Sequence, residues 1–313
     1  MNWNGKPYHS LDFMLKERFG DKIYKLALNG GMTCPNRDGT LGLRGCIFCS
    51  QEGSGDFAGD KCQSVTKQIN EQKAKLCQKR NARYFIAYFQ AYTNTYAPIE
   101  YLTAIFTEAI EHPDIIALSI ATRPDCLSAE VLELLDTLNQ KKPVWIELGL
   151  QTIHPQTAQY IRRGYDLSCF EEAVRNLRTL HIEVIVHTIL GLPGENENAL
   201  IQTMEYLNKQ DIQGVKLQLL HILENTDLAK DYKAGHFTVY EMEEYINLVI
   251  SCLEHLSPDI VIHRVTGDGP KDLLLAPLWS SAKRTVLNTL HRTCKARSTW
   301  QGKEFYGRIT DFI

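Results

Sequence analysis

The sequence predicts an α/β protein built on a partial (β/α)6 barrel, followed by a C-terminal extension of helix and strand. Runs rich in β-branched and aromatic residues alternate with amphipathic helical patterns about every thirty residues. Strands that alternate with helices form parallel sheets with right-handed crossovers. Six such units are too few to close an eight-stranded barrel, so we expect an open, partial one.

The expected elements follow one another along the chain. Six strands are expected at 22–29, 82–92, 114–123, 143–153, 183–190 and 214–223, with a seventh, peripheral strand within 259–268. Helices are expected at 64–79, 98–112, 128–140, 197–210 and 239–256, with a helix-rich stretch at 154–180 that is broken at 162–166. Pro98 opens the second helix and Ser128 is a good N-cap for the third. The domain prediction is an N-terminal extension (1–20), the barrel core (21–225) and a C-terminal extension (226–313).

Composition limits the class of protein. The chain has 313 residues, 44% of them hydrophobic, which suffices for one barrel domain. The first ten residues, MNWNGKPYHS, lack the basic and apolar runs of a secretory signal, and no apolar run is long enough to span a membrane. We therefore expect a cytoplasmic protein without a membrane partner. Nine cysteines in such a chain favour a metal or catalysis over disulfides.

Three cysteines form the most informative motif. Cys34, Cys46 and Cys49 lie within CPNRDGTLGLRGCIFC, separated by eleven and then two residues. Three thiolates can ligate three irons of a [4Fe–4S] cubane and leave the fourth iron open for a substrate or cofactor. The alternative is a structural zinc site, which normally has four protein ligands.

Polar segments follow the predicted strands at the ends where barrel enzymes place their chemistry. They are QAYTNT (90–95), ATRPD (121–125), ELGLQT (147–152) and GLPGE (191–195). Glu147 and Gln151 are four residues apart on a strand, so both point to the face of Gly149. A salt-bridged core acid remains an alternative for Glu147, and an ordinary turn for ATRPD.

Basic residues gather near the C-terminus. Residues 271–313 hold eight basic and three acidic side chains, a net charge of +5 in a chain whose total is −3. Such a segment can contact a polyanion, and a solvated helix face is the alternative.

The cysteine loop resembles that of the radical S-adenosylmethionine (SAM) enzymes. Its long first gap is similar to the branch that contains the catalytic subunit of Elongator. The strings CPNRDGT, FQAYTNT, ATRPD and HRVTGD resemble the small YhcC/YtqA-type proteins of that superfamily. The resemblance covers roughly residues 20–270.

The resemblance implies a [4Fe–4S] cluster on Cys34, Cys46 and Cys49, which act in catalysis, with SAM on the open iron and a 5′-deoxyadenosyl radical as the reactive species. It also implies a set of residues around SAM: Phe48, Gln90, Glu147, Gln151, Arg163, Ile189, Gly191 and Gly194. The segment after the second strand lacks the GGE element of many members. Gln90, Thr93, Asn94 and Thr95 are candidates to replace its contact with the SAM amino group.

The resemblance further implies a tRNA substrate with a modified wobble uridine, converted from carboxymethylaminomethyluridine to aminomethyluridine. A small electron donor such as flavodoxin or ferredoxin is the implied second partner. Candidate substrate contacts are Thr93, Asn94, Arg123, His263, Arg264, Lys283, Arg284 and Arg292. Two alternatives remain: a radical SAM enzyme for a small molecule such as a tetrapyrrole, and a zinc-stabilised RNA-binding module without catalysis.

Overall fold

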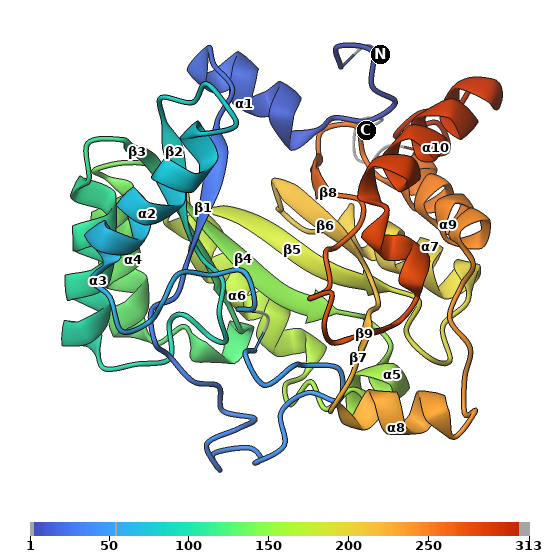
Figure 1. Ribbon diagram of the computed structural model, residues 1–313, viewed down its shortest axis with the longest axis horizontal. Coiled ribbons are helices and arrows are strands. Elements are labelled where there is room, and N and C mark those ends of the chain that lie inside the picture. Colours follow the sequence, from blue (N-terminus) through green and yellow to red (C-terminus); the bar gives the residue numbers. More distant parts are fainter. Residues whose placement is uncertain (1–2, 54, 307–313) are drawn as a thin grey trace, which may run out of the picture. The chain divides into compact units, whose positions relative to one another are not determined.

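A computed structural model describes residues 3–53 and 55–306. Its main sheet has seven parallel strands that form a half-barrel, in the order β1-β2-β3-β4-β5-β6-β8 (Figure 1). The strands are β1 (Tyr24–Leu28), β2 (Phe85–Phe89), β3 (Ile115–Thr122), β4 (Val144–Gln151), β5 (Glu183–Leu190), β6 (Gly214–Leu219) and β8 (Val261–Arg264). The predicted α/β partial barrel is confirmed. The seventh strand, expected as peripheral, is an edge strand of this sheet and pairs parallel with β6.

Helices follow the strands as the alternation predicts. They are α1 (Leu11–Phe19), α2 (Val65–Cys77), α3 (Ile99–Glu111), α4 (Ala129–Asn139), α5 (Pro155–Tyr160), α6 (Leu167–Thr179), α7 (Glu197–Leu207), α8 (Asp227–Lys233), α9 (Met242–His255) and α10 (Lys283–Ala296). Ser128 caps α4 as expected, because its side chain accepts a hydrogen bond from the Val131 amide. The sequence interpretation gave no helix for α1, α8 or α10, which are nine, seven and fourteen residues long.

The expected sixth strand is shorter than predicted. It ends at Leu219, and β7 (Ile222–Leu223) then pairs antiparallel with β9 (Leu274–Ala276) in a separate two-stranded sheet. Two short 3₁₀ helices, η1 (Pro124–Cys126) and η2 (Leu278–Ser281), complete the elements.

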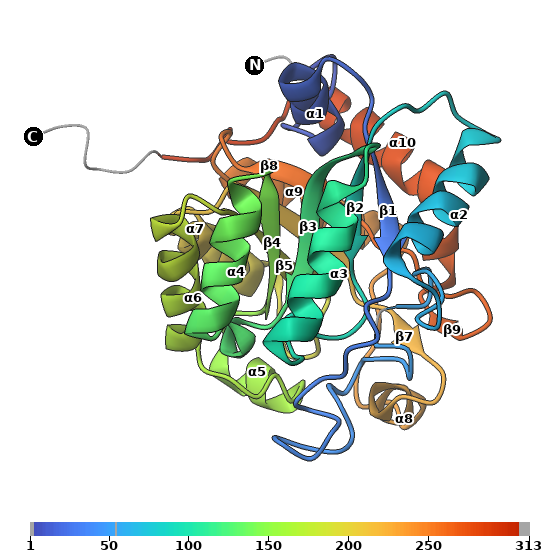
Figure 2. The ribbon, with the colours of Figure 1, turned by 90° about the vertical axis from the view of Figure 1, so that its left-hand side faces the viewer.

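The described chain forms two compact units. The first unit comprises residues 15–149 and 162–185. In it α2, α3 and α4 lie side by side, and α2 and α3 pack on β1 and β3 (Figure 2). Every residue of β2 is buried, and Phe89 meets Phe106 of α3 edge to face at 5.1 Å between ring centroids. Burying such a side chain contributes about 1.5–3 kcal/mol, so this core holds the loops at the strand ends in place.

The second unit comprises residues 3–14, 150–161 and 186–306 of the described chain. In it α9 packs against both α7 and α10. Glu241 and Glu244 form a capping box at the start of α9. In the part of the chain that is described, no helix has both the length and the apolar character that crossing a bilayer requires.

Candidate active site

The three cysteines lie in one loop between β1 and α2. Cys46 and Cys49 flank a tight turn, in which the Cys49 amide donates to the Cys46 carbonyl at 3.1 Å. Arg37 braces this turn from within the loop by donating to the carbonyls of Cys49 and Ser50, at 3.2 and 2.5 Å. A Cβ atom on Gly45 would lie 2.8 Å from the Arg37 side chain, and Gly45 has a φ of 73°. The glycine before Cys46 therefore allows the guanidinium to pass behind the turn.

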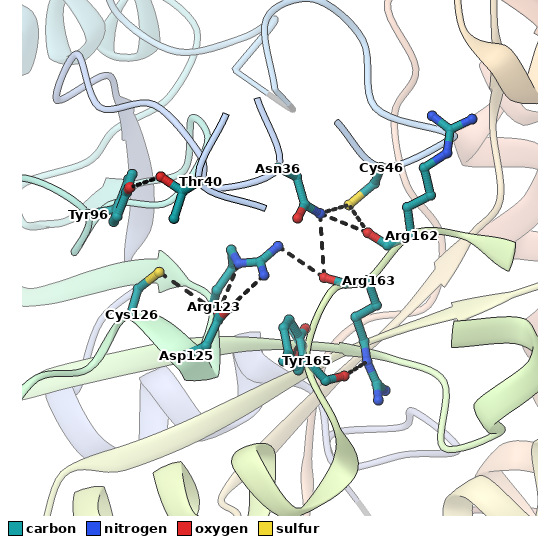
Figure 3. A network of polar contacts seen from close by, with 11 residues as sticks. Asn36, Thr40, Cys46, Tyr96, Arg123, Asp125, Cys126, Arg162, Arg163 and Tyr165 are labelled. Carbon is teal, nitrogen blue, oxygen red and sulfur yellow. Dashed lines mark hydrogen bonds and ion pairs between the residues drawn. The ribbon is translucent and has the colours of Figure 1, made fainter. Parts of the chain in front are cut away.

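Asn36 anchors the loop to the segment that follows α5 (Figure 3). Its side-chain amide donates to the Cys46 sulfur at 3.3 Å and to the backbone carbonyl of Arg162 at 2.8 Å. The carbonyl of Arg163 lies at 3.4 Å from the same nitrogen. Asn36 is 5% exposed, so these bonds are shielded from water. A buried amide thus joins the cysteine loop to the predicted RRGYD break.

Arg123 supports the same segment from the end of β3 (Figure 3). It forms a bidentate ion pair with Asp125, at 2.9 and 2.7 Å, and donates to the Arg163 carbonyl at 3.0 Å. Its guanidinium stacks over the Tyr165 ring, 4.9 Å from the centroid. Tyr165 in turn donates to the Gly149 carbonyl of β4 at 2.7 Å. The Arg123 charge is therefore matched within the protein, and its expected role as a substrate contact stays a prediction.

The electrostatics of the loop favour a thiolate at Cys46. A hydrogen bond from Cys49 lowers the pKa of the Cys46 thiol, with smaller contributions from Asn36 and from the charges of Arg123 and Arg37, while burial opposes them. The same bond and burial raise the pKa of the Cys49 thiol. Three soft sulfur donors beside two guanidinium groups are chemically suited to an iron–sulfur cluster. Within residues 3–53 and 55–306, no three His, Cys, Asp or Glu side chains gather tightly enough to enclose a single metal ion.

The segment after β2 is buried and closely bonded. The Gln90 amide donates to the Leu28 carbonyl at 3.3 Å. Asn94 is fully buried and donates to the Ala121 carbonyl at 2.8 Å. Its side-chain oxygen has no hydrogen-bond partner among the described residues. The chain lacks the GGE element in this segment, and the Asn94 oxygen is an acceptor there that no described residue uses.

Two of the predicted β4 residues have different environments. Glu147 is fully buried in mid-strand, forms an ion pair with Lys25 of β1, and accepts from Ser119 at 2.8 Å. This is the arrangement of the alternative interpretation, a paired core acid. Gln151 ends the strand with a φ of 63°, an uncommon conformation outside glycine.

The GLPGE turn after β5 has the backbone that its glycines require. Gly191 and Gly194 have φ values of 93° and 88°. A Cβ on Gly194 would meet no protein atom of the described residues within 4 Å, so within the protein the glycine serves the backbone conformation. Glu195 is 8% exposed and accepts a hydrogen bond from the Thr152 hydroxyl. Burial raises the pKa of the Glu195 carboxyl.

The other residues predicted to contact SAM or the substrate are divided between the two units. Phe48 is half-buried in the cysteine loop, and Arg163 is buried and donates to the Tyr165 carbonyl at 3.0 Å. Ile189 is 8% exposed on β5. His263 and Arg264 end β8, and Lys283, Arg284 and Arg292 lie on α10. The structure thus gathers the three cysteines and Arg123 with the 162–165 segment in the first unit, whereas Arg264 and the α10 residues belong to the second.

Sequence reasoning missed Asn36, Arg37, Asp125 and Tyr165. Asn36 and Arg37 lie in the quoted CPNRDGT string, and Tyr165 lies in RRGYD. Their position in these motifs could have marked them as candidates. No local pattern, however, predicts which carbonyl groups or aromatic rings they contact.

A pocket of about 730 Å³ opens beside this network in the first unit. Its walls come from residues 95–98, 124–128 and α6, and Asp125, Cys126 and Cys169 are among the lining residues. Burial raises the pKa of the Cys126 thiol to about 12, so this cysteine is a neutral thiol at physiological pH.

Comparisons with known proteins identify the family. The model of the radical SAM superfamily matches residues 34–207, and that of the radical SAM C-terminal domain matches residues 212–296. The chain is 43% identical over 306 residues to YtqA of Bacillus subtilis, covering 98% of this chain and 95% of YtqA. It is 38% identical over 279 residues to YhcC of Escherichia coli, covering 89% of each.

More distant relatives are also similar. A tRNA uridine(34) acetyltransferase of Dehalococcoides mccartyi is 29% identical over 187 residues, which are 58% of this chain and 40% of that protein. The solved structure of Elp3 from Methanocaldococcus infernus has a TM-score of 0.68 at 16% identity, covering 89% of this chain and 64% of that one, and so shares the fold. The chain therefore belongs to the radical SAM superfamily, in the Elongator-like branch with the small YhcC/YtqA-type proteins.

Proposed function

We propose that Cys34, Cys46 and Cys49 hold a [4Fe–4S] cluster and that the protein uses it to modify the wobble-uridine side chain of tRNA. The proposed reaction converts carboxymethylaminomethyluridine to aminomethyluridine. The observation that carries the radical part is the cysteine loop itself, with three thiols in one loop and Asn36 fixing its position. The tRNA part has its support in the relatives and in the surface of α10.

Membership of the superfamily implies a [4Fe–4S] cluster and SAM as cofactors. When bound, they supply a 5′-deoxyadenosyl radical that abstracts hydrogen from the substrate, with the electron coming from a small donor such as flavodoxin or ferredoxin. The protein supplies binding, orientation and exclusion of water. Asn36 and Arg37 would hold the cysteine turn in position for the cluster, through their bonds to the Arg162 and Cys49 carbonyls.

SAM carries an ammonium group, which needs a hydrogen-bond acceptor from the protein. The unused Asn94 oxygen, in the segment after β2, is the acceptor that we assign to the ammonium. Because that atom is buried, the segment has to shift slightly when SAM binds. Asn94→Ala is therefore expected to weaken SAM binding several-fold, the cost of about one hydrogen bond. Equilibrium dialysis with SAM measures this, with iron content as the control for the cluster.

The exposed face of α10 is suited to phosphates. Arg284, Arg292 and Lys295 are exposed, and their spacing of eight and three residues places them on one side of the helix. Trp300, just beyond the helix, is 42% exposed and could stack on a base. Lys283, by contrast, is engaged with Asp268 at 2.5 Å. The exposed set is thus a better candidate for tRNA contact than the set predicted from the sequence.

The test is a titration of undermodified tRNA against the cluster-loaded protein at several salt concentrations. Each phosphate contact contributes about 0.7–0.9 to the slope of log affinity against log salt. Replacing Arg284, Arg292 and Lys295 together by Ala should reduce that slope by about 2 to 3. Lys283→Ala is the matched control and should leave the slope unchanged, because Lys283 is already ion-paired. Absence of tRNA binding at low salt by the wild type would refute the tRNA substrate, and equal slopes would refute the role of α10.

A second test addresses the reaction. In a strain that lacks this protein, tRNA nucleosides should show carboxymethylaminomethyluridine in excess and aminomethyluridine depleted. An unchanged nucleoside profile would contradict the proposed reaction even if tRNA binds.

A further inference from the structure

The loop after β8 wraps around His221, which follows β6 in the second unit. A Cβ atom on Gly267 would lie 3.0 Å from the His221 Cε1 atom, and one on Gly269 would lie 3.3 Å from Cδ2. Two glycines therefore let the backbone lie directly against the imidazole. The fully buried Tyr245 of α9 donates to the Val265 carbonyl at 2.9 Å and fixes the start of this loop. The histidine and the loop thus form one packed structure.

Three polar side chains in or next to this loop have no hydrogen-bond partner among the described residues. The Arg264 guanidinium makes no hydrogen bond or ion pair with any described residue, although it is partly buried. The His221 Nε2 atom and the Thr266 hydroxyl are buried and also have no partner within residues 3–53 and 55–306. Folded proteins contain only a few such groups, and each one calls for an explanation such as a ligand. Arg264 ends β8, Thr266 follows it, and His221 lies just beyond β6, the strand that pairs with β8.

Arg264 carries a positive charge that forms no ion pair with a described residue. The loop between β8 and β9 carries Lys271 and two acidic residues, Asp268 and Asp272, and Asp268 forms an ion pair with Lys283 at 2.5 Å. Burial lowers the pKa of the His221 imidazole to about 4; Asp268 opposes this shift and Arg264 adds to it. His221 is therefore neutral near pH 7 and keeps one N–H. A hydrogen on Nε2 would make this unpartnered atom a donor, which is the tautomer that an oxyanion would select.

We propose that Arg264 and His221 form a subsite for an oxyanion of the substrate, and that this oxyanion is the carboxylate of the carboxymethylaminomethyl group. The inference rests on the proposed function. A guanidinium binds a carboxylate through two parallel hydrogen bonds, and the His221 N–H adds a neutral donor beside it. The substrate carries this carboxylate and the aminomethyl product does not. The subsite would therefore favour the substrate over the product and help the product to leave. A tRNA phosphate has the same chemistry and is the other source of an oxyanion.

The test compares two tRNAs that differ only at the wobble position, one with carboxymethylaminomethyluridine and one with aminomethyluridine. Each is titrated against cluster-loaded wild type, Arg264→Gln and Arg264→Lys. The wild type should bind the carboxylated tRNA about tenfold more tightly, the typical value of a charge-assisted contact. Arg264→Gln should remove this preference without weakening binding of the aminomethyl tRNA, and Arg264→Lys should retain part of it. Arg80→Gln, an exposed arginine on the first unit, is the matched control and should bind as the wild type does.

The other outcomes separate the possible failures. If Arg264→Gln weakens both tRNAs equally and lowers the salt slope by about 1, Arg264 holds a phosphate and the carboxylate assignment is wrong. If neither tRNA binds the wild type, the proposed function fails, and the subsite is judged with acetate alone. In that case the NMR signals of the His221 ring should move with acetate in the wild type and stay still in Arg264→Gln. Signals that do not respond in the wild type would overturn the subsite as well.

Discussion

Replacing Asn36 with Ala should release the cysteine loop from the 162–163 segment. The change removes the donor that bonds the Arg162 carbonyl at 2.8 Å and the Cys46 sulfur at 3.3 Å. Each bond is worth about 1 kcal/mol, and a buried carbonyl left without its donor adds about 1–3 kcal/mol. We therefore expect the docked loop to lose about 3 kcal/mol, which corresponds to an undocked population about a hundredfold larger.

Iron retention measures this effect. The variant is reconstituted anaerobically, and iron loss to a chelator is followed by visible absorption. The rate of loss should rise about a hundredfold if loss proceeds through the undocked loop. Asn208→Ala is the matched control, because Asn208 likewise bonds two backbone groups, the His255 carbonyl at 2.7 Å and the Ser257 amide at 2.9 Å. It should lower thermal stability and leave the rate of iron loss unchanged.

Two results would refute the reasoning. If Asn36→Ala retains iron as the wild type does, the amide does not position the loop. If Asn208→Ala loses iron equally fast, general destabilisation and not loop docking explains the effect.

Three further predictions follow from the geometry. Cys46→Ala should abolish the cluster absorption and Cys62→Ala, an exposed cysteine, should retain about four irons per chain; cluster loss in Cys62→Ala would contradict the three-ligand assignment. Gly194→Val should cost about 1–2 kcal/mol of stability through backbone strain at a φ of 88° and should weaken SAM binding, whereas unchanged melting temperature and SAM affinity would contradict this. The pKa of His221 is depressed to about 4, so its contribution to stability is present above pH 6.5 and is lost as the pH falls. The free energy of unfolding should drop by about 2 kcal/mol between pH 6.5 and 5, and a His221→Asn protein with the same drop would disprove the assignment.

The sequence predicted the barrel well because its signals are local. Runs of β-branched and aromatic residues alternate with helical patterns along the core, and the Ser128 cap lies where its type and position predict. Helix α8 was not predicted because its seven residues form only about two helical turns, too few to show a clear hydrophobic period. The β7–β9 pairing joins segments about fifty residues apart, and no local pattern encodes such a partner.

In the candidate site, too, local features could be predicted from the sequence and long-range contacts could not. Cysteine spacing is a local property, so the ligand set could be proposed from residues 34–49 alone. The bond from Asn36 to the Arg162 carbonyl spans 126 residues and follows from the fold. The same holds for Glu147, whose burial was foreseeable from its strand but whose partner, Lys25, was not.

The long gap between Cys34 and Cys46 explains why this loop needs such bonds. Closing a flexible loop costs conformational entropy, and a longer gap costs more, although the increase is slow. Within this gap Asn36 and Arg37 supply bonds to both sides of the loop, at the Arg162 carbonyl and at the Cys49 carbonyl. These bonds belong to the protein itself, so they offset part of the cost of ordering the loop. If the three thiols hold the cluster as proposed, its retention should depend on Asn36 and Arg37 as well, and Asn36→Ala measures that dependence.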